Sequence, residues 1–258
     1  MTAGNGLARF PGIAGKRVFI TGGGSGIGAA LVSAFAEQGA TVGFVDIAVE
    51  AGNALCERLA SQGLARPLFR LCDIRDIASL QSVMQGLAAE VGDFDVLVNN
   101  AGNDDRHRIE DVSVEYWDDR IAINQRPMFF ACQSVAPGMK RKGGGSIINI
   151  GSASWHMAGG GYPVYTTSKA AVSGLTRGLA RDLGPFRIRV NTVTPGWVMT
   201  ERQIALWLDE EGEKQIDRSQ CLPGRVQPWH VARMVLFLAA DDSAMCTAQE
   251  FIVDGGWV

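Results

Sequence analysis

The amino-acid sequence predicts one α/β domain built on a doubly wound parallel sheet. Three observations predict this fold: short β-branched runs alternate with longer helical patterns, the runs are apolar throughout, and the first run leads into a glycine-rich turn. Continuously apolar strands are typical of parallel sheets that helices cover on both faces. Strand–helix alternation is typical of βαβ units. A chain of 258 residues suits a single domain of this class.

Seven runs are expected to form the strands. In chain order they are RVFIT (17–21), TVGFVD (41–46), LFRLCD (68–73), DVLVNN (95–100), SIINIGS (146–152), IRVNTVTPG (188–196) and EFIVDGG (250–256). Helical patterns lie between them. The segment of about residues 200–228 interrupts the alternation, and long segments of this kind are often functional. We therefore expect a single domain over residues 1–258, with a substrate lid inserted at 200–228.

Composition and charge argue against several classes of protein. The net charge is −3, the pI is about 5.7 and no long basic run is present, so no nucleic-acid partner is expected. The longest apolar run, VARMVLFLAA, is too short to span a bilayer, and the first residues lack the apolar core of a signal peptide. Five cysteines without a CxxC pair favour reduced thiols in a cytoplasmic protein over a disulfide framework or a metal site.

The glycine-rich turn TGGGSGIG (Thr21–Gly28) lies between the first strand and a helix. Glycines let the backbone pass close to a pyrophosphate, and a helix N-terminus offers free N–H groups to it. Such a turn alone is weak support, because it also suits a simple tight turn. Its place after the first strand favours a Rossmann-like fold that binds a dinucleotide.

Two aspartates extend this interpretation. Asp46 ends the second strand, 18 residues after Gly28, where a carboxylate binds a ribose 2′-OH and repels a 2′-phosphate. Because no Arg or Lys lies in the glycine turn or just after Asp46, NAD is favoured over NADP. Asp73 ends the third strand, where it could meet the adenine edge. Helix capping is the alternative role at both positions.

The stretch YTTSK holds a pair suited to acid–base chemistry. Tyr165 and Lys169 are four residues apart on a predicted helix and share a face, whereas Tyr162 has Thr166 at that spacing. A free tyrosine has a pKa of about 10, and a neighbouring ammonium favours the phenolate. The spacing therefore selects Tyr165 over Tyr162 as the base and leaves Tyr162 as a pocket wall or packing residue.

Taken in order, the motifs resemble the short-chain dehydrogenase/reductase family over essentially the whole chain. They are TGGGSGIG, NNAG (99–102), the single residues Asn124 and Ser152, YTTSK, and PGWVMT (195–200). Each is weak alone; their order and spacing are specific. The resemblance implies a nicotinamide dinucleotide and the catalytic set Asn124, Ser152, Tyr165 and Lys169. The expected cofactor-binding residues are Gly22, Gly24, Ser25, Gly26, Ile27, Gly28, Asp46, Ile47, Asp73, Ile74, Asn100, Ala101, Gly102, Tyr165, Lys169, Pro195, Gly196, Val198 and Thr200.

The physical chemistry of alcohol oxidation agrees with these roles. Tyr165 would take the hydroxyl proton while a hydride leaves to the nicotinamide, and Ser152 would hold the reacting oxygen. Lowering a tyrosine pKa by about three units corresponds to roughly 4 kcal/mol. The Lys169 ammonium and the cationic nicotinamide are the natural sources of this stabilisation.

A proline follows Asn124 by three residues in a predicted helix. Pro127 has no N–H, so the carbonyl of Ile123 loses its helical donor and we expect a kink. Our hypothesis is that the kink frees main chain to hold a water between Asn124 and Lys169, since the resemblance gives this neighbourhood a proton-relay role. The alternative is a proline accommodated without catalytic effect.

Further segments resemble the aldose branch of the family, among them NNAGNDDRH (99–107) and GSASWH (151–156). This implies oxidation of the anomeric C1 hydroxyl of a pentose or related, D-xylose-like sugar to an aldonolactone. The expected substrate-binding residues are Asn103, Ser152, Ser154, Trp155, His156, Tyr165, Trp197 and Arg202, although packing or a solvated loop would explain several of them. The glycines of MAGGGYPV (157–164) remove side chains from the expected pocket wall. The sugar is therefore open among D-xylose, L-arabinose, D-galactose, L-fucose and L-rhamnose.

Other functions stay open at this point. A reductase of a ketone, 3-oxoacyl or other secondary alcohol substrate would need an apolar cleft, and the acidic DD pairs argue against it. A non-enzymatic NAD-binding sensor should lack part of the catalytic set, which is complete here. The resemblance also implies a homotetramer, with the last helix and the C-terminal strand at an interface.

Overall fold

The seven predicted strands form one parallel sheet. The computed structural model describes residues 8–258, and within them the strand order is β3-β2-β1-β4-β5-β6-β7. The strands are β1 (Arg17–Thr21), β2 (Thr41–Asp46), β3 (Leu68–Leu71), β4 (Val96–Asn99), β5 (Gly145–Ile150), β6 (Ile188–Pro195) and β7 (Glu250–Val253). The order reverses beside β1, between β1 and β4, and doubly wound sheets bind ligands at the carboxyl ends of the strands at such a point.

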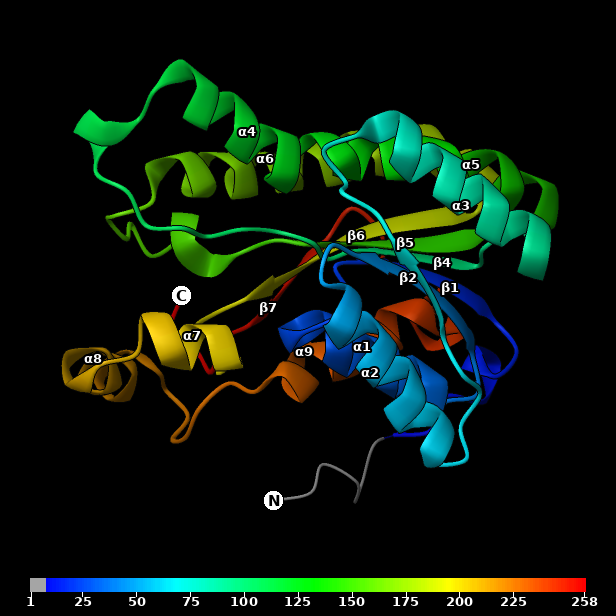
Figure 1. Ribbon diagram of the computed structural model, residues 1–258, viewed down its shortest axis with the longest axis horizontal. Helices are drawn as coiled ribbons and strands as arrows, with labels where there is room; N and C mark the ends of the chain where they lie inside the picture. Colours follow the sequence, from blue (N-terminus) through cyan, green and yellow to red (C-terminus); the bar gives the residue numbers. More distant parts are fainter. Residues whose placement is uncertain (1–7) are drawn as a thin grey trace.

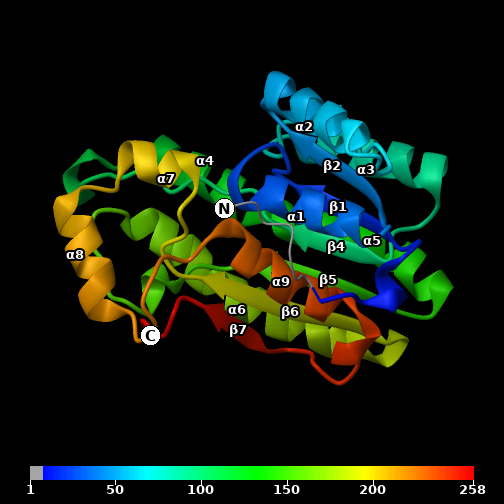
Figure 2. The ribbon, with the colours of Figure 1, turned by 90° about the horizontal axis from the view of Figure 1, so that it is seen from below.

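Helices cover both faces of the sheet (Figure 1). On one side lie α1 (Gly26–Glu37), α2 (Val49–Ser61) and α9 (Pro228–Ala239); on the other lie α3 (Ile77–Val91), α4 (Val114–Asn124), α5 (Arg126–Lys142) and α6 (Pro163–Leu183). Helices α1 and α9 pack side by side (Figure 2). Each face of the sheet has its own buried apolar cluster, one including Phe35 and Leu236 and the other including Leu80 and Met139. The strands are thus apolar because both faces are covered.

All seven predicted strands are observed, but five end earlier than the sequence predicts. Asp73, Asn100 and Ser152 follow their strands instead of ending them, while β6 ends at Pro195 and β7 at Val253. The sequence also predicts that every strand is covered on both faces. Strand β3 departs from this, because it lies at the edge of the sheet and leaves Leu71 exposed.

The segment predicted as one helix around Asn124 is two helices. Helix α4 ends at Asn124 and α5 begins at Arg126, while Gln125 between them has φ −130° and ψ −57°. Pro127 occupies the first turn of α5, where a missing N–H costs no helical hydrogen bond. The expected kink is therefore a complete break.

Two short helices, α7 (Glu201–Leu206) and α8 (Glu210–Ser219), fill most of the segment predicted to interrupt the alternation. Figure 1 draws them apart from the two helical layers, near the C-terminus of the chain. Among residues 8–258 no helix combines the length and the apolar character that crossing a membrane requires.

Candidate active site

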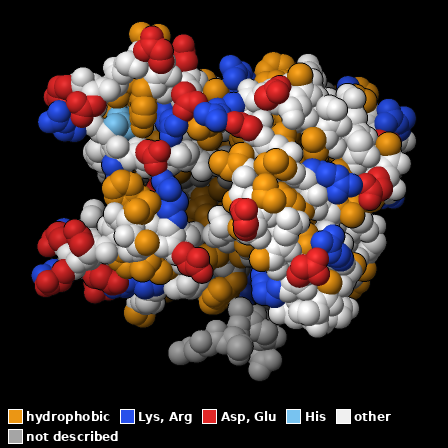
Figure 3. All heavy atoms as spheres, in the orientation of Figure 1, with side chains coloured by type: hydrophobic (Ala, Val, Ile, Leu, Met, Phe, Trp, Pro, Cys, Tyr) orange, Lys and Arg blue, Asp and Glu red, His pale blue; other side chains and the backbone are white. Residues whose placement is uncertain are grey.

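A cavity of about 1230 Å³ opens at the carboxyl ends of the strands. Its walls come from the glycine turn after β1, the ends of β2 to β6, the start of α6 and helix α7. The space-filling view shows this side of the molecule hollowed between the part that holds α4 and the part that holds α7 (Figure 3). The site predicted from the strand ends is therefore a continuous space.

The glycine turn is held by backbone and amide hydrogen bonds. The Asn100 side-chain amide donates to the carbonyls of Thr21 and Gly22 at 3.0 and 2.8 Å. A Cβ atom at Gly28 would lie 1.8 Å from the Gly22 carbonyl oxygen, so only glycine allows this approach. Gly22 and Gly26 have φ of +66° and +53°, which favours glycine. The turn forms a cradle of the kind that a pyrophosphate needs.

The two aspartates expected near the nucleoside differ in their partners. Asp46 accepts hydrogen bonds from the N–H groups of Gly24 and Ala48, at 2.8 and 2.9 Å. Asp73 instead pairs with Arg75 at 2.6 Å, and this contact lowers the pKa of the Asp73 carboxyl. Asp46 thus lies against the glycine turn, while Asp73 begins a chain of charged residues.

Lys169, which lines the cavity, and Asn124, which lies behind its wall, are both held by hydrogen bonds to the main chain. The Lys169 ammonium donates to the Ile150 carbonyl at 2.8 Å, and burial lowers the pKa of Lys169 to about 8. The Asn124 amide is buried and bonds the backbone of Asn103 twice, at 2.8 and 3.0 Å. A Cβ atom at Gly102 would meet the Asn124 Oδ1 at 3.1 Å and the Lys169 Nζ at 3.4 Å. The glycine therefore lets these two polar groups approach one position.

Tyr165 lies above the lysine on the first turn of α6. The Lys169 Nζ is 5.8 Å from the centre of the Tyr165 ring. Burial raises the pKa of Tyr165, and contact with the Ser152 hydroxyl partly offsets this rise. Ser152 also accepts a hydrogen bond from the Ser154 N–H at 3.2 Å. The side chains of Ser152, Tyr165 and Lys169 all line the same cavity.

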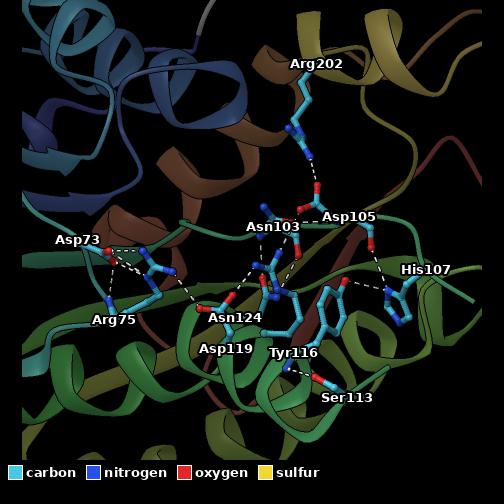
Figure 4. A network of polar contacts seen from close by, with 11 residues as sticks. Asp73, Arg75, Asn103, Asp105, His107, Ser113, Tyr116, Asp119, Asn124 and Arg202 are labelled. Carbon is cyan, nitrogen blue, oxygen red and sulfur yellow. Dashed lines mark hydrogen bonds and ion pairs between the residues drawn. The ribbon is translucent and has the colours of Figure 1, made fainter. Parts of the chain in front are cut away.

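Helix α7 is tied to the loop of residues 103–107, which follows β4 (Figure 4). Asp104 accepts a hydrogen bond from Gln203 at 2.6 Å, and Asp105 pairs with Arg202 at 2.5 Å. Arg106 lies over the ring of Trp207 at 5.1 Å. Three consecutive loop residues thus contact α7 and the residue that ends it.

A charged network extends this loop toward Asp73, which follows β3 (Figure 4). Asp105 also pairs with Arg120 at 3.1 Å, Arg120 pairs with Asp119, and Asp119 pairs with Arg75 at 2.9 Å. Arg75 in turn pairs with Asp73, the last residue of the network. The two ends of the site are therefore joined by alternating charges.

His107 anchors the loop from its other end. Its ring nitrogens lie 3.0 Å from the Tyr116 hydroxyl and 3.3 Å from the Val164 N–H. Its backbone N–H donates to the Gly161 carbonyl at 2.8 Å. This histidine is engaged on both sides of its ring, so its role is to hold the loop against the start of α6.

The structure brings most of the predicted residues to the cavity. All predicted cofactor residues except Gly24 line it, as do Asn103, Ser152, Ser154, Trp197 and Arg202. Trp155 and His156 do not: their rings stack on each other at 3.6 Å, and the His156 Nε2 lies 3.1 Å from Glu250. Asn124 lies behind the wall, where it holds Asn103.

Several lining residues were not among the predicted site residues. They include Arg75, Arg106, Arg120, Met157, Gln203, Gln215 and Trp257. Tyr162, which the sequence left as a pocket wall or a packing residue, lines the cavity. Nothing in the local sequence around Arg106 or Trp257 marks them, because the fold of the lid and of the C-terminus brings them in.

Comparison with known proteins agrees with the geometry of this site. A family model described as enoyl-(acyl carrier protein) reductase matches residues 22–258. The chain is 52% identical to D-xylose 1-dehydrogenase of Caulobacter vibrioides. The alignment spans 250 residues, which are 97% of this chain and 98% of that protein. It is 47% identical over 249 residues to a probable galactose dehydrogenase of Rhizobium meliloti, covering 96% and 97%.

Solved structures show the same fold. A 3-oxoacyl-[acyl-carrier protein] reductase from Brucella melitensis superposes with a TM-score of 0.90 at 30% identity, covering 98% of this chain and 94% of that one. A structure of such a reductase with bound NAD, also from Brucella melitensis, gives a TM-score of 0.87 at 29% identity and the same coverage. The chain belongs to the short-chain dehydrogenase/reductase family, whose members use a nucleotide cofactor.

Proposed function

We propose that the protein is an NAD-dependent aldose 1-dehydrogenase, which oxidises the anomeric hydroxyl of a pentose or related sugar to an aldonolactone. One observation carries the proposal. Ser152, Tyr165 and Lys169 line one cavity with the glycine cradle, in a chain 52% identical to a D-xylose 1-dehydrogenase. The 47% identity to a probable galactose dehydrogenase supports an aldose more broadly.

When bound, the nicotinamide supplies the acceptor for the C1 hydride. Tyr165 accepts the proton of the C1 hydroxyl, and Ser152 donates a hydrogen bond to the oxygen as C1 becomes a lactone carbonyl. Burial opposes the Tyr165 phenolate, so positive charge is needed to stabilise it. The Lys169 ammonium, which burial leaves protonated below about pH 8, supplies part of that charge.

Asn124 acts through Asn103 and the main chain around it. Its two hydrogen bonds fix the start of the 103–107 loop, one residue beyond Gly102. The break after α4 leaves main chain beside Asn124 without a continuing helix. This supports the hypothesis of a water held between Asn124 and Lys169 as a proton relay.

Asp46 supports NAD as the cofactor. Its carboxylate lies against Gly24, where a ribose 2′-OH can donate to it and a 2′-phosphate would meet like charge. We expect Asp46→Ser to lower the preference for NAD over NADP by about 10- to 100-fold, since like-charge contacts cost several kcal/mol. Steady-state kcat/KM with both cofactors measures this. An unchanged ratio would show that the 2′ position lies elsewhere.

Helices α7 and α8 act as the lid over the sugar. Three residues of this segment line the cavity and also contact the loop of residues 103–107; they are Arg202, Gln203 and Trp207. These contacts join the lid to the loop that follows β4. Removal of water from the site strengthens the electrostatic interactions within it.

The experiment is NADH formation from NAD with a panel of pentoses, hexoses and 6-deoxyhexoses, with Tyr165→Phe as the control. Turnover of a sugar that the variant loses supports the proposal. No turnover on any sugar, with turnover of a ketone and NADH in the reverse direction, would favour the reductase alternative.

A homotetramer remains part of the proposal. Apolar side chains are exposed on α4, α5 and β7, among them Trp117 at 41%, Phe129 at 44% and Ile252 at 39%. Ile252 lies on β7, the C-terminal strand at which the family resemblance implies an interface. Sedimentation of the purified protein measures the state directly.

A further inference from the structure

Arg106 is a charged residue of the cavity that the catalytic scheme does not use. It lines the cavity together with Tyr162 and Trp207. Its guanidinium lies 4.3 Å from the Tyr162 ring centre and 5.1 Å from the Trp207 ring centre. Within the described part of the chain it has no hydrogen-bond or ion-pair partner, although two aspartates precede it in the sequence.

The two aspartates are engaged elsewhere. Asp104 meets Gln203 and Arg202, while Asp105 meets Arg120 and Arg202. Neither lies within ion-pair distance of Arg106. The charge of Arg106 therefore reaches the site without direct neutralisation, and it opposes, to a small extent, the rise in the pKa of Tyr165 that burial causes.

The N–H donors of the Arg106 guanidinium are available to a ligand. A guanidinium is flat, and its N–H donors all lie in its plane, at the edge. The guanidinium carbon lies near the rings of both Tyr162 and Trp207, and among residues 8–258 no polar group takes up its N–H donors. Such an edge matches two neighbouring oxygen acceptors in one plane.

The position relative to the chemistry fits a sugar ring. The Tyr162 and Tyr165 rings are neighbours, with centres 6.1 Å apart, so Tyr162 lies beside both the Arg106 guanidinium and the base. Added Cβ atoms at Gly160 and Gly161 would meet nothing within 4 Å, so the wall beside Tyr162 leaves room for the far side of the sugar.

We propose that Arg106 is a substrate-binding residue whose guanidinium donates to the oxygens at C3 and C4 of the aldose, on the side of the ring away from C1. This inference rests on the proposed function. Arg106 then selects the sugar by the relative orientation of these two hydroxyls, while Ser152 and Tyr165 act on C1.

The experiment uses sugar and protein variants together. Arg106→Lys keeps the positive charge but loses the two-pronged donor geometry and the flat guanidinium that lies against the rings. Arg108→Lys is the matched control, because Arg108 is in the same region, pairs with Asp111 and does not line the cavity. The substrates are D-xylose and D-galactose, each with its 4-deoxy and 2-deoxy analogue, and the readouts are kcat/KM for the sugar and the Kd for NADH.

In the parent enzyme the 4-deoxy sugar should lose about 10- to 100-fold in kcat/KM, as expected for a hydrogen bond to a charged group. In Arg106→Lys most of that 4-deoxy penalty should disappear, while the 2-deoxy penalty and the Kd for NADH stay unchanged. Arg108→Lys should retain both penalties. A structural role alone would lower the activity on all the sugars by one factor and leave the 4-deoxy penalty intact, which overturns the proposal.

Two further results would separate this inference from the function on which it rests. Turnover of a sugar by the parent enzyme, with equal 4-deoxy penalties in the parent and in Arg106→Lys, would refute the role of Arg106 and leave the aldose function standing. Faster turnover of D-galacturonate than of D-galactose, lost in Arg106→Lys, would show that the guanidinium binds a carboxylate and overturn the assignment to C3 and C4. Without turnover of any sugar, both proposals fall.

Discussion

The two halves of the cavity are built from different parts of the chain. The cofactor half is made of backbone: a glycine turn, the N–H groups that meet Asp46 and the carbonyls that hold Asn100. The sugar half is made of side chains, where residues 104–106 meet residues 202–207 from another part of the sequence. Backbone geometry tolerates few substitutions, whereas side-chain contacts can be exchanged singly. The first half therefore fixes the family chemistry, and the second half is open to change of substrate.

The largest effect on activity should come from substitution of Tyr165, which lies where the two halves of the cavity meet. Tyr165→Phe removes the group that takes the proton and should lower kcat by about 10²- to 10⁴-fold, the usual contribution of acid–base catalysis. The rate of NADH formation, with a sugar that the parent enzyme oxidises, measures this loss of kcat. NADH binding, followed by fluorescence, should be unchanged. A variant with more than a tenth of the parent activity would remove Tyr165 from the mechanism.

Gly28→Ala should disrupt the cofactor half. The added methyl group would lie 1.8 Å from the Gly22 carbonyl oxygen, so the turn must move. We expect weaker NADH binding and a loss of about 3 kcal/mol of stability, the upper end for overpacking. Gly160→Ala is the control, because its methyl group meets nothing within 4 Å. Equal thermal unfolding and NADH binding in the two variants would contradict this account of the turn.

Lys169→Met tests how much the burial of the Lys169 ammonium lowers the stability of the folded protein. The pKa of Lys169 falls from 10.5 to about 8 on burial, so the unfolded chain binds more protons between these pH values and stability rises with pH there. The variant lacks this dependence. Below pH 8 the free energy of unfolding of the variant should exceed that of the parent by up to about 3 kcal/mol. The loss of the hydrogen bond from Lys169 to the Ile150 carbonyl reduces this gain.

The advantage of Lys169→Met should then shrink as the pH rises from 8 to 10.5. Denaturant unfolding of the cofactor-free protein at several pH values measures this difference. A constant difference would mean that Lys169 keeps an ordinary pKa.

The smallest effect belongs to the sugar half. Arg202→Gln removes ion pairs with Asp104 and Asp105 whose partners are partly exposed, and exposed pairs contribute at most about 1 kcal/mol. We expect KM for the sugar to rise by no more than about fivefold. Raising the salt concentration should weaken sugar binding in the parent more than in the variant. Arg218→Gln, on α8 and paired with Glu211, serves as the control. A 100-fold loss would mean that Arg202 binds the sugar itself.

The same division explains what the sequence predicted. The strands, and the residues proposed to hold the cofactor, could be predicted because hydrophobic pattern, glycine turn and strand-end aspartate are local features. Tyr165 and Lys169 could be found because helical spacing brings them to one face. The break after Asn124 was predicted only as a kink, since Pro127 permits either, and the conformation of Gln125 decides it.

Side-chain positions in the sugar half were harder to predict. His156 was expected at the substrate, but it pairs with Glu250, 94 residues away in the sequence. Arg106 was not singled out, because its position depends on Trp207, which the lid brings to it. Contacts between residues about 100 apart in sequence leave no local pattern in the chain.

The open wall at Gly160 has an evolutionary consequence. Gly22 and Gly28 cannot gain a side chain without moving backbone, and Gly161 has a φ of +85° that disfavours one. Gly160 has neither restriction and faces the cavity. A single substitution there can narrow the pocket and change the preferred sugar while leaving the cofactor site and the fold as they are, so new substrate ranges are one mutational step away.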